Sequence, residues 1–155
     1  MSKLKKGEYV VSAIENGTVI DHIPPRSLFQ VISILGLEKL NVQITFGNNL
    51  ESKKLGLKGI VKIADRFFDD GEVNKIALVA PEAKLSTIRD FQVVEKRKVK
   101  VPDEVSGIVK CLNPKCITNY ERITTLFYVI DIKPVILKCH YCEKMVEQYQ
   151  MTMIV

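Results

Sequence analysis

The chain has 155 residues with a formal net charge of +5, and 46% of them are hydrophobic. This length allows one ordinary domain or two small ones, and the composition is typical of a soluble globular protein. No apolar run approaches the roughly 20 residues of a helical membrane span, so we expect no membrane partner. The N-terminal sequence Met1–Lys6 lacks the apolar segment of a secretory signal, which predicts a cytoplasmic location.

The positive charge is unevenly distributed. Residues 1–100 contain 17 Lys and Arg against 12 Asp and Glu, whereas residues 101–155 contain six of each. A zinc module that binds nucleic acid would carry the basic patch itself. The asymmetry therefore argues against a nucleic-acid partner and directs a small anionic ligand to the first part of the chain.

The first elements in chain order are two strands over residues 8–14 and 19–23, joined at Asn16-Gly17, a dipeptide that favours tight hairpin turns. A helix is predicted from Pro25 to Leu35, where apolar residues recur at helical spacing and Gly36 provides a C-terminal cap. The following elements are expected to be a strand (42–46), a polar loop (47–59), a strand (60–63), a helix capped by Asp69 or Asp70 and ended by Pro81, and a hairpin (83–88 and 91–94).

This order of elements predicts an α+β fold. Strands and helices alternate, with hairpins at both ends, which favours an antiparallel sheet with two helices on one face, related to the ferredoxin-like plan. The charged segment 95–103 ends at a proline and is the expected linker. We therefore predict an N-terminal domain over residues 1–100 and a second domain over residues 101–155.

The second domain is predicted to be a small all-β module. Short strands are expected at 108–110, 122–130, 135–138 and 145–149. The apolar tail 151–155 is expected either to pack against this module or to serve at an interface. About fifty residues are close to the size at which a hydrophobic core alone becomes marginal, so a bound metal would supply stability.

All four cysteines lie in this module, as a C-x4-C pair (Cys111 and Cys116) and a C-x2-C pair (Cys139 and Cys142) separated by 22 residues. Two short turns that face each other suit one tetrahedral, structural Zn²⁺. The alternatives are two disulfides, disfavoured without a secretory signal, or four free thiols. Because four sulfurs complete the coordination shell, His140 is expected to be a solvated turn residue.

The sequence contains no nucleophile motif, P-loop or G-x-G-x-x-G run, so we predict no catalytic residue. Asp21 and His22 are neighbours on a predicted strand and are expected to point to opposite faces. Lys58, Lys62 and Lys96 would converge on one phosphate group if their strands were neighbours; the alternative is a solvated charged face, and the residues alone do not decide.

Two motifs together carry a resemblance to a known family. The run Gly17-Thr-Val-Ile-Asp-His-Ile-Pro24 and the cysteine set followed by Glu143-Lys144 resemble the regulatory chain of aspartate carbamoyltransferase over nearly the full length. The resemblance implies a non-catalytic chain of de novo pyrimidine synthesis. Its N-terminal domain would bind CTP, ATP and, as a further candidate, UTP, and would pair with a second regulatory chain. Its zinc domain would contact the catalytic chain.

The resemblance also implies a nucleotide-binding set. The base and ribose region would be lined by Val11, Ser12, Ala13, Ile14 and Val19, with Asp21 at the ribose and Lys62 at the ribose or base. The base would be flanked by Ser86, Ile88, Phe91 and Val93, and the phosphates would be met by His22, Lys58 and Lys96. Relatives often carry other polar residues at Ser12 and Ser86, so base selectivity stays open.

Two other functional classes were weighed. A zinc ribbon that binds nucleic acid is suggested by the isoelectric point of about 9.0 and by the cysteine spacing. A zinc hydrolase would require an open coordination position, which a site with four sulfurs does not leave.

Overall fold

The computed structural model describes residues 13–154. The strand expected over 8–14 therefore lies outside the described residues except for Ala13 and Ile14, which are not in a strand. The first part of the chain comprises β1 (Gly17–Ile23), α1 (Leu28–Ile34), β2 (Ile44–Ser52), β3 (Gly56–Ala64), α2 (Asp70–Ile76), β4 (Lys84–Arg89) and β5 (Gln92–Lys98). The second comprises β6 (Glu104–Ser106), β7 (Val109–Lys110), β8 (Leu126–Ile132), β9 (Val135–Cys139), β10 (Met145–Glu147) and β11 (Thr152–Met153).

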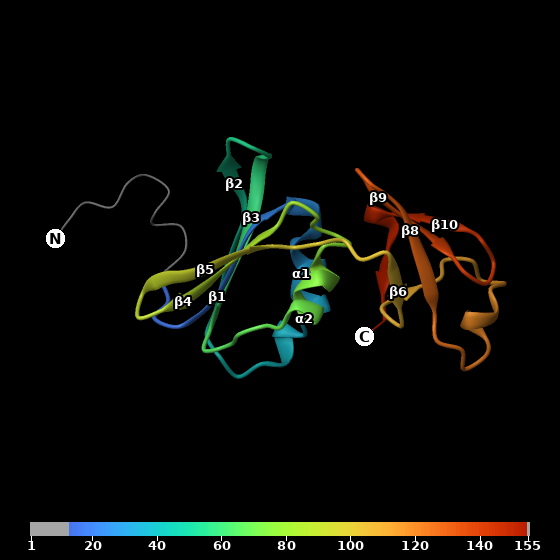
Figure 1. Cartoon of the computed structure of the whole chain (residues 1–155), viewed down its shortest axis with the longest axis horizontal. Coiled ribbons are helices and arrows are strands. Elements are labelled where there is room, and N and C mark those ends of the chain that lie inside the picture. The colour runs from blue at the N-terminus through green and yellow to red at the C-terminus, as the bar shows by residue number, and fades with distance from the viewer. Residues whose placement is uncertain (1–12, 155) are drawn as a thin grey trace.

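The first five strands form one sheet in the order β2-β3-β1-β4-β5, and all neighbouring pairs are antiparallel. Both helices lie on one face of this sheet (Figure 1). The predicted α+β architecture is confirmed. β1 is the central strand of the sheet. Its apolar side chains Ile20 and Ile23 face the helices and are fully buried.

The predicted loop over 47–59 is wrong. β2 continues to Ser52 and β3 begins at Gly56, so only residues 53–55 form the turn. This segment is polar because its side chains are mostly exposed or half-buried, and apolar alternation therefore gives no signal of a strand. Backbone pairing across the hairpin holds it in the sheet instead.

α2 begins as the sequence predicts. The Asp69 carboxylate accepts a hydrogen bond from the Glu72 backbone N–H at 2.8 Å, and the Glu72 carboxylate accepts one from the Asp69 N–H at 3.4 Å. This reciprocal capping satisfies two donors that the first turn of a helix leaves unpaired. In α1, Gly36 follows the helix with a left-handed φ of 63°, which confirms the expected cap.

β5 extends through Lys98 and so occupies part of the segment predicted as linker. Its Arg97 side chain reaches the helix layer, where it donates to the Asp70 carboxylate and to the Phe68 carbonyl, both at 2.9 Å. The charged segment is a strand here because its backbone pairs with β4, and Arg97 adds contacts with α2 and the preceding loop.

The C-terminal strands form a four-stranded sheet, β10-β9-β8-β6, and a small β7-β11 pair. The predicted all-β module is confirmed. The apolar tail packs against its own module: Thr152 and Met153 pair with Lys110 and Val109, and Met151 is buried.

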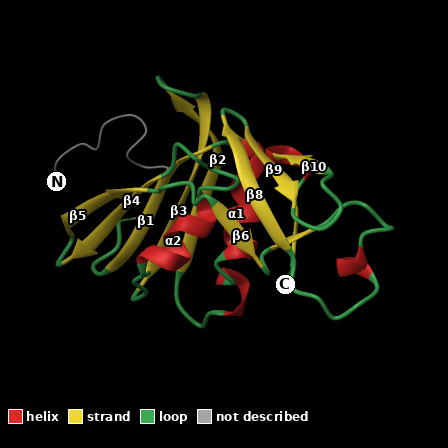
Figure 2. Cartoon of the chain, turned by 45° about the vertical axis from the view of Figure 1, so that its right-hand side comes forward, coloured by secondary structure: helices red, strands yellow, loops and turns green. Residues whose placement is uncertain are grey.

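The helix layer lies between the five-stranded sheet and the C-terminal module (Figures 1 and 2). Buried residues from both parts form one continuous core. Two polar contacts join the layers: the Gln30 side chain donates to the Met151 carbonyl at 3.2 Å, and the buried Gln148 side chain donates to the Val79 carbonyl at 3.2 Å. Because the core is continuous, the domain division at residue 100 stays a prediction.

Within the described residues, no helix has the length and apolar character needed to cross a membrane.

Gln148 provides a test of this layer contact. Its amide donates to Val79 and accepts from the Val135 N–H at 3.1 Å, so Gln148→Ala leaves two buried backbone groups unpaired. We expect the free energy of unfolding to fall by about 2–4 kcal/mol in chemical denaturation. The exposed control Gln92→Ala should change it by less than about 0.5 kcal/mol; equal effects of the two variants would contradict the packing described here.

Candidate functional site

The four cysteine sulfurs converge in the C-terminal module. All lie within 4.8 Å of one another, and the Cys111–Cys142 and Cys116–Cys139 sulfur pairs are 3.6 and 3.8 Å apart. Four thiolates at about 2.3 Å from one Zn²⁺ would be about 3.8 Å apart at the corners of a tetrahedron. A disulfide requires about 2.05 Å, so the disulfide alternative does not fit, and the arrangement fits one structural metal ion.

Local hydrogen bonds shape both cysteine turns. In the first, the Cys116 N–H donates to the Asn113 carbonyl at 3.0 Å, and the Asn119 amide donates to the carbonyls of Cys111 and Asn113. In the second, Glu143 has a left-handed φ of 63° and its N–H donates to the Cys139 carbonyl at 2.9 Å. Each turn is therefore built by its own short sequence, which explains why spacing alone predicted the site.

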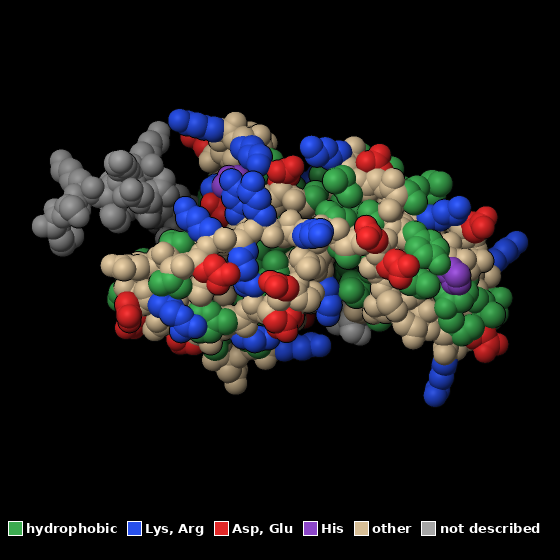
Figure 3. Space-filling model, viewed as in Figure 1, with side chains coloured by type: hydrophobic (Ala, Val, Ile, Leu, Met, Phe, Trp, Pro, Cys, Tyr) green, Lys and Arg blue, Asp and Glu red, His purple; other side chains and the backbone are tan. Residues whose placement is uncertain are grey.

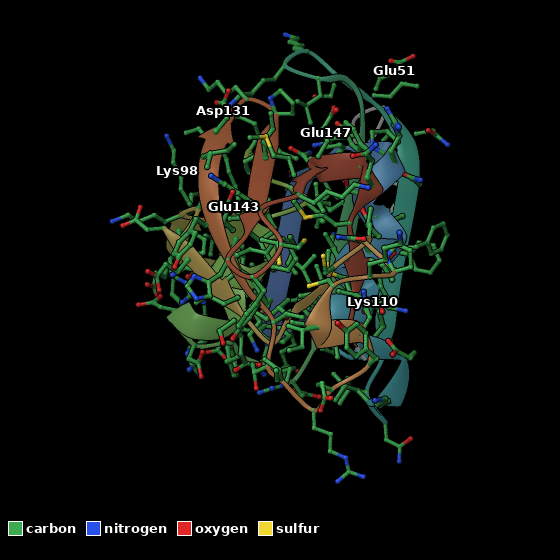
Figure 4. The ribbon with its side chains drawn as sticks, turned by 90° about the vertical axis from the view of Figure 1, so that its right-hand side faces the viewer. Glu51, Lys98, Lys110, Asp131, Glu143 and Glu147 are labelled. Atoms are coloured by element: carbon green, nitrogen blue, oxygen red, sulfur yellow. The ribbon has the colours of Figure 1, made fainter. Side chains whose placement is uncertain are left out.

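Figure 4 shows the outer side of this module, with Asp131 at the tip of the β8–β9 hairpin and Glu143 beside the cysteine-bearing end. His140 is exposed and its Nδ1 lies 2.6 Å from the Tyr128 hydroxyl. It is absent from the group of possible ligands found among the described residues. The expectation that His140 is a turn residue outside the metal shell is confirmed.

Burial and local hydrogen bonds shift the pKa values of three of the four thiols. Burial raises the pKa of Cys111 to about 12 and also raises that of Cys139. Burial opposes ionisation of Cys142 too, but the Lys144 N–H and neighbouring side chains outweigh it and lower its pKa to about 7. Buried thiols of high pKa become thiolates when a cation coordinates them. The Thr118 hydroxyl, 3.2 Å from the Cys116 sulfur, would then donate to a thiolate.

A second candidate site lies on the face of the five-stranded sheet away from the helices. A pocket of about 380 Å³ is lined by Asp21, His22, Lys84, Leu85, Ser86, Lys96, Arg97 and Lys98. Four of these residues, Asp21, His22, Ser86 and Lys96, belong to the nucleotide-binding set expected from the sequence. Figure 3 shows Lys and Arg side chains gathered on this part of the molecule.

Strand register orders this face of the sheet into three rows, since directly paired residues of a sheet share a face, and the pocket lies beside the second and third rows. The apolar row is Gly17, Ile88 and Val93; the central row is Lys62, Val19, Ser86 and Lys96; the charged row is Asp21, Lys84 and Lys98. Moving along the strands, the surface therefore changes from an apolar row to two rows that each carry two lysines, with Asp21 in the last of them.

The expectation that Asp21 and His22 point apart is wrong. His22 ends the regular part of β1 with a left-handed φ of 61°, which breaks the alternation of a strand. Its Nδ1 consequently lies 3.6 Å from the Asp21 carboxylate. Asp21 also holds Lys58, whose Nζ is 2.8 Å from Oδ1.

The idea that three lysines meet at one phosphate group also fails. β1 and β4 separate the strands of Lys62 and Lys96, so these residues are three strand spacings apart, about 14 Å. Lys58 is paired with Asp21. Lys62 and Lys96 instead lie at opposite ends of one row across the sheet, a span that would hold a whole nucleotide.

Two of these side chains have lowered pKa values. Burial lowers the pKa of His22, with Lys58, Lys84 and Lys54 adding to the effect and Asp21 opposing it. Burial likewise lowers the pKa of Lys62, again against Asp21. Burial and the neighbouring lysines therefore both favour the neutral imidazole of His22, and a bound anion would oppose them.

The remaining expected residues lie toward the apolar row. The Phe91 N–H donates to the Glu15 carbonyl at 2.9 Å, which joins the β4–β5 turn to the segment that contains Ala13 and Ile14. Ile14 and Ile88 are buried, whereas Phe91 and Val93 are exposed. Val11 and Ser12 lie outside the described residues.

Lys84 and Lys98 were missed as pocket residues. Their signal was the alternation in Lys84-Leu85-Ser86 and Lys96-Arg97-Lys98, which places the first and third residue of each run on one face. The pairing of β4 with β5 is needed to show that the side chains of both runs lie on the same face of the sheet.

Comparisons with known proteins match both parts of the chain to the domains of one family. Residues 9–100 match the family described as aspartate carbamoyltransferase regulatory chain, allosteric domain, and residues 103–152 match its metal binding domain. Similar proteins bear the name aspartate carbamoyltransferase regulatory chain. That of Bacteroides fragilis is 59% identical over 144 residues, 93% of this chain and 94% of the relative. That of Pyrococcus horikoshii is 54% identical over 143 residues, 91% of this chain and 94% of the relative. These matches support the regulatory reading and not the nucleic-acid-binding zinc ribbon.

The metal site can be tested by removing one ligand. We expect Cys139→Ser to reduce bound metal from one ion per chain to nearly none, measured by elemental analysis, and to unfold the C-terminal module, because metal binding and folding are coupled. The control Val146→Ala opens a cavity in the same module and should lower stability while keeping one ion per chain. A Cys139→Ser protein that kept its metal would contradict the assignment.

Proposed function

The chain belongs to the family of aspartate carbamoyltransferase regulatory chains, and we propose that it senses nucleoside triphosphates on the outer face of its sheet. CTP and ATP are the main candidate effectors, with UTP as a third. Zn²⁺ held by the four cysteines would fix the C-terminal module, which would contact the catalytic chain. A second regulatory chain would pair through the N-terminal domain. The chain itself is regulatory and not catalytic, and its role would be to control de novo pyrimidine synthesis.

The change along the strands, from the apolar row to the lysine-bearing rows beside the pocket, is the observation that carries the nucleotide proposal. A nucleotide presents the flat faces of its base, which stack on apolar surfaces, at one end and several negative charges on its phosphates at the other. The apolar row suits the base, and the central row suits the ribose and first phosphate. In the charged row, Lys84 and Lys98 lie where the phosphate chain would extend, whereas the Asp21 carboxylate would meet a ribose hydroxyl. Lys96 and a protonated His22 would make charge-assisted hydrogen bonds with the phosphates.

Zn²⁺ is the metal that best fits the cysteine set. Four thiolates in tetrahedral array favour zinc or an iron–sulfur centre, and a closed shell of four sulfurs gives zinc a structural role without redox chemistry. When bound, the ion would neutralise the thiolates and hold the two turns together. Cys139 and Cys142 would thereby fix the end of β9 against the loop that follows Cys111.

The layered arrangement supports a route for the regulatory signal. The pocket lies on one face of the sheet, the helices on the other, and the metal module beyond the helices. A nucleotide changes the activity of the assembly only if its affinity differs between two states, typically by about 1–3 kcal/mol. The Gln148–Val79 contact lies at the boundary that such a change must cross.

Calorimetry on the full chain tests nucleotide binding. We expect CTP and ATP to bind the wild type, and Lys96→Ala to weaken both by about tenfold, because a charge-assisted hydrogen bond of about 1.5 kcal/mol or more is lost. The control Lys39→Ala removes an exposed lysine from another surface and should change affinity by less than twofold. If neither nucleotide binds the wild type, the proposal fails.

The lowered pKa of His22 predicts a pH dependence. A bound polyanion raises the pKa of the imidazole, so binding takes up a proton and favours the protonated form. The ratio of wild-type to His22→Gln affinity for CTP should therefore rise as pH falls from 8 to 6. Because both proteins bind the same CTP at each pH, the ratio removes the effect of phosphate protonation on affinity. A ratio that stayed constant, or fell, would show that His22 does not meet the phosphates.

A further inference from the structure

Glu82 lies where the sheet, the helix layer and the C-terminal module meet. It belongs to the segment between α2 and β4, and its carboxylate lies 3.0 Å from the ammonium group of Lys54, in the turn between β2 and β3. Both side chains are partly exposed, 49% for Lys54 and 42% for Glu82. An ion pair at such a surface typically contributes only about 0.2–1 kcal/mol. The pair can therefore be exchanged for another with a small change in free energy.

The C-terminal module approaches the same segment. Lys133 lies in the turn between β8 and β9, and the N–H of Val135, two residues later, donates to the Gln148 side chain at 3.1 Å. Gln148 in turn donates to the carbonyl of Val79 at 3.2 Å, three residues before Glu82. One buried glutamine therefore joins the start of β9, beside Lys133, to the segment that carries the carboxylate.

The electrostatics of Glu82 agree with this placement. The hydrogen bond from Lys54 and its charge lower the pKa of the Glu82 carboxyl, burial opposes them, and Lys133 and Lys98 add to the lowering. Within residues 13–154, neither Lys133 nor Lys98 has a carboxylate at ion-pair distance. Lys133 therefore acts on the Glu82 carboxylate from a greater distance while Lys54 holds it.

Lys54 is also sensitive to the pocket. Its charge contributes to the lowered pKa of His22, which lines the pocket. The turn that carries Lys54 and the start of β9 lie at the same end of the molecule (Figure 1). A polyanion in the pocket would attract the Lys54 ammonium group and so compete with Glu82. Of the two other cations near Glu82, Lys98 lines the same pocket and would be drawn to the anion too, which leaves Lys133.

We propose that Glu82 exchanges ion-pair partners when a polyanion occupies the pocket, leaving Lys54 of the sheet and pairing with Lys133 of the C-terminal module. This inference rests on the proposed function, in which the polyanion is a nucleoside triphosphate. The new pair would join the sheet edge to the module only in the occupied state, as a route beside the packed helix layer. Because linkage is reciprocal, the pair must in turn strengthen nucleotide binding.

Titration calorimetry with CTP on the full, zinc-loaded chain tests the exchange through double-mutant cycles. Lys133→Gln removes the partner of the occupied state, so CTP should bind about threefold more weakly. The same substitution should change the affinity by less than about 1.5-fold in a Glu82→Gln background, where the new pair cannot form. It should also have little effect in a Lys54→Gln background, because Glu82 would then pair with Lys133 both with and without CTP.

Lys115→Gln removes the same charge from another exposed position on the module and should have the same small effect in all three backgrounds. Circular dichroism of each variant checks that the fold is intact. A Lys133→Gln effect that persisted in either background would show an independent action of its charge. That result, or no effect in a chain that binds CTP, would overturn the exchange while leaving the nucleotide site standing. If the wild type binds no CTP, the proposed function fails and the inference fails with it.

Discussion

The structure depends on burial, from two sides, of the segment in which α2 ends. Five consecutive residues, the last residue of α2 and the turn that follows it (Ile76 to Ala80), are fully buried. Complete burial of five successive side chains requires cover on more than one side, and the C-terminal module, which contacts Val79 through Gln148, provides the second layer. The module is too small to hold its shape by apolar burial alone, and the four converging sulfurs supply the missing constraint. A metal ion held by these sulfurs would therefore help to determine how the helix layer is covered.

This arrangement leaves the opposite face of the sheet available for a ligand. Along each strand, residues that would touch a nucleotide alternate with residues that pack on the helices: Val19 with Ile20, Lys62 with Val61, Ser86 with Leu85. A ligand that shifts one strand must consequently shift the side chains beneath it. Close-packed cores transmit such displacements because they contain few voids. The sheet and the metal module are linked through the helices by packing, with Gln148 as a directional polar contact.

Local features were predictable from the sequence and long-range ones were not. The cysteine turns and the Asp69 cap each depend on a few neighbouring residues, so spacing and residue type were enough. The rows of the pocket depend on which strands pair and in what register, which is why Lys84 and Lys98 were missed. The predicted loop over 47–59 failed because its strands are held by backbone pairing rather than by apolar side chains. The left-handed backbone of His22 reversed the expected direction of its side chain.

The most direct test of the account is whether the two ends of the chain communicate in the assembled enzyme. CTP affinity should be measured on the complex with the catalytic chain, with and without a saturating, unreactive substrate analogue in the active site. Linkage requires that coupling be reciprocal, so we expect CTP affinity to change by about 5–150-fold between the two conditions. An unchanged affinity, in a complex that binds both CTP and the analogue, would contradict transmission through the helix layer.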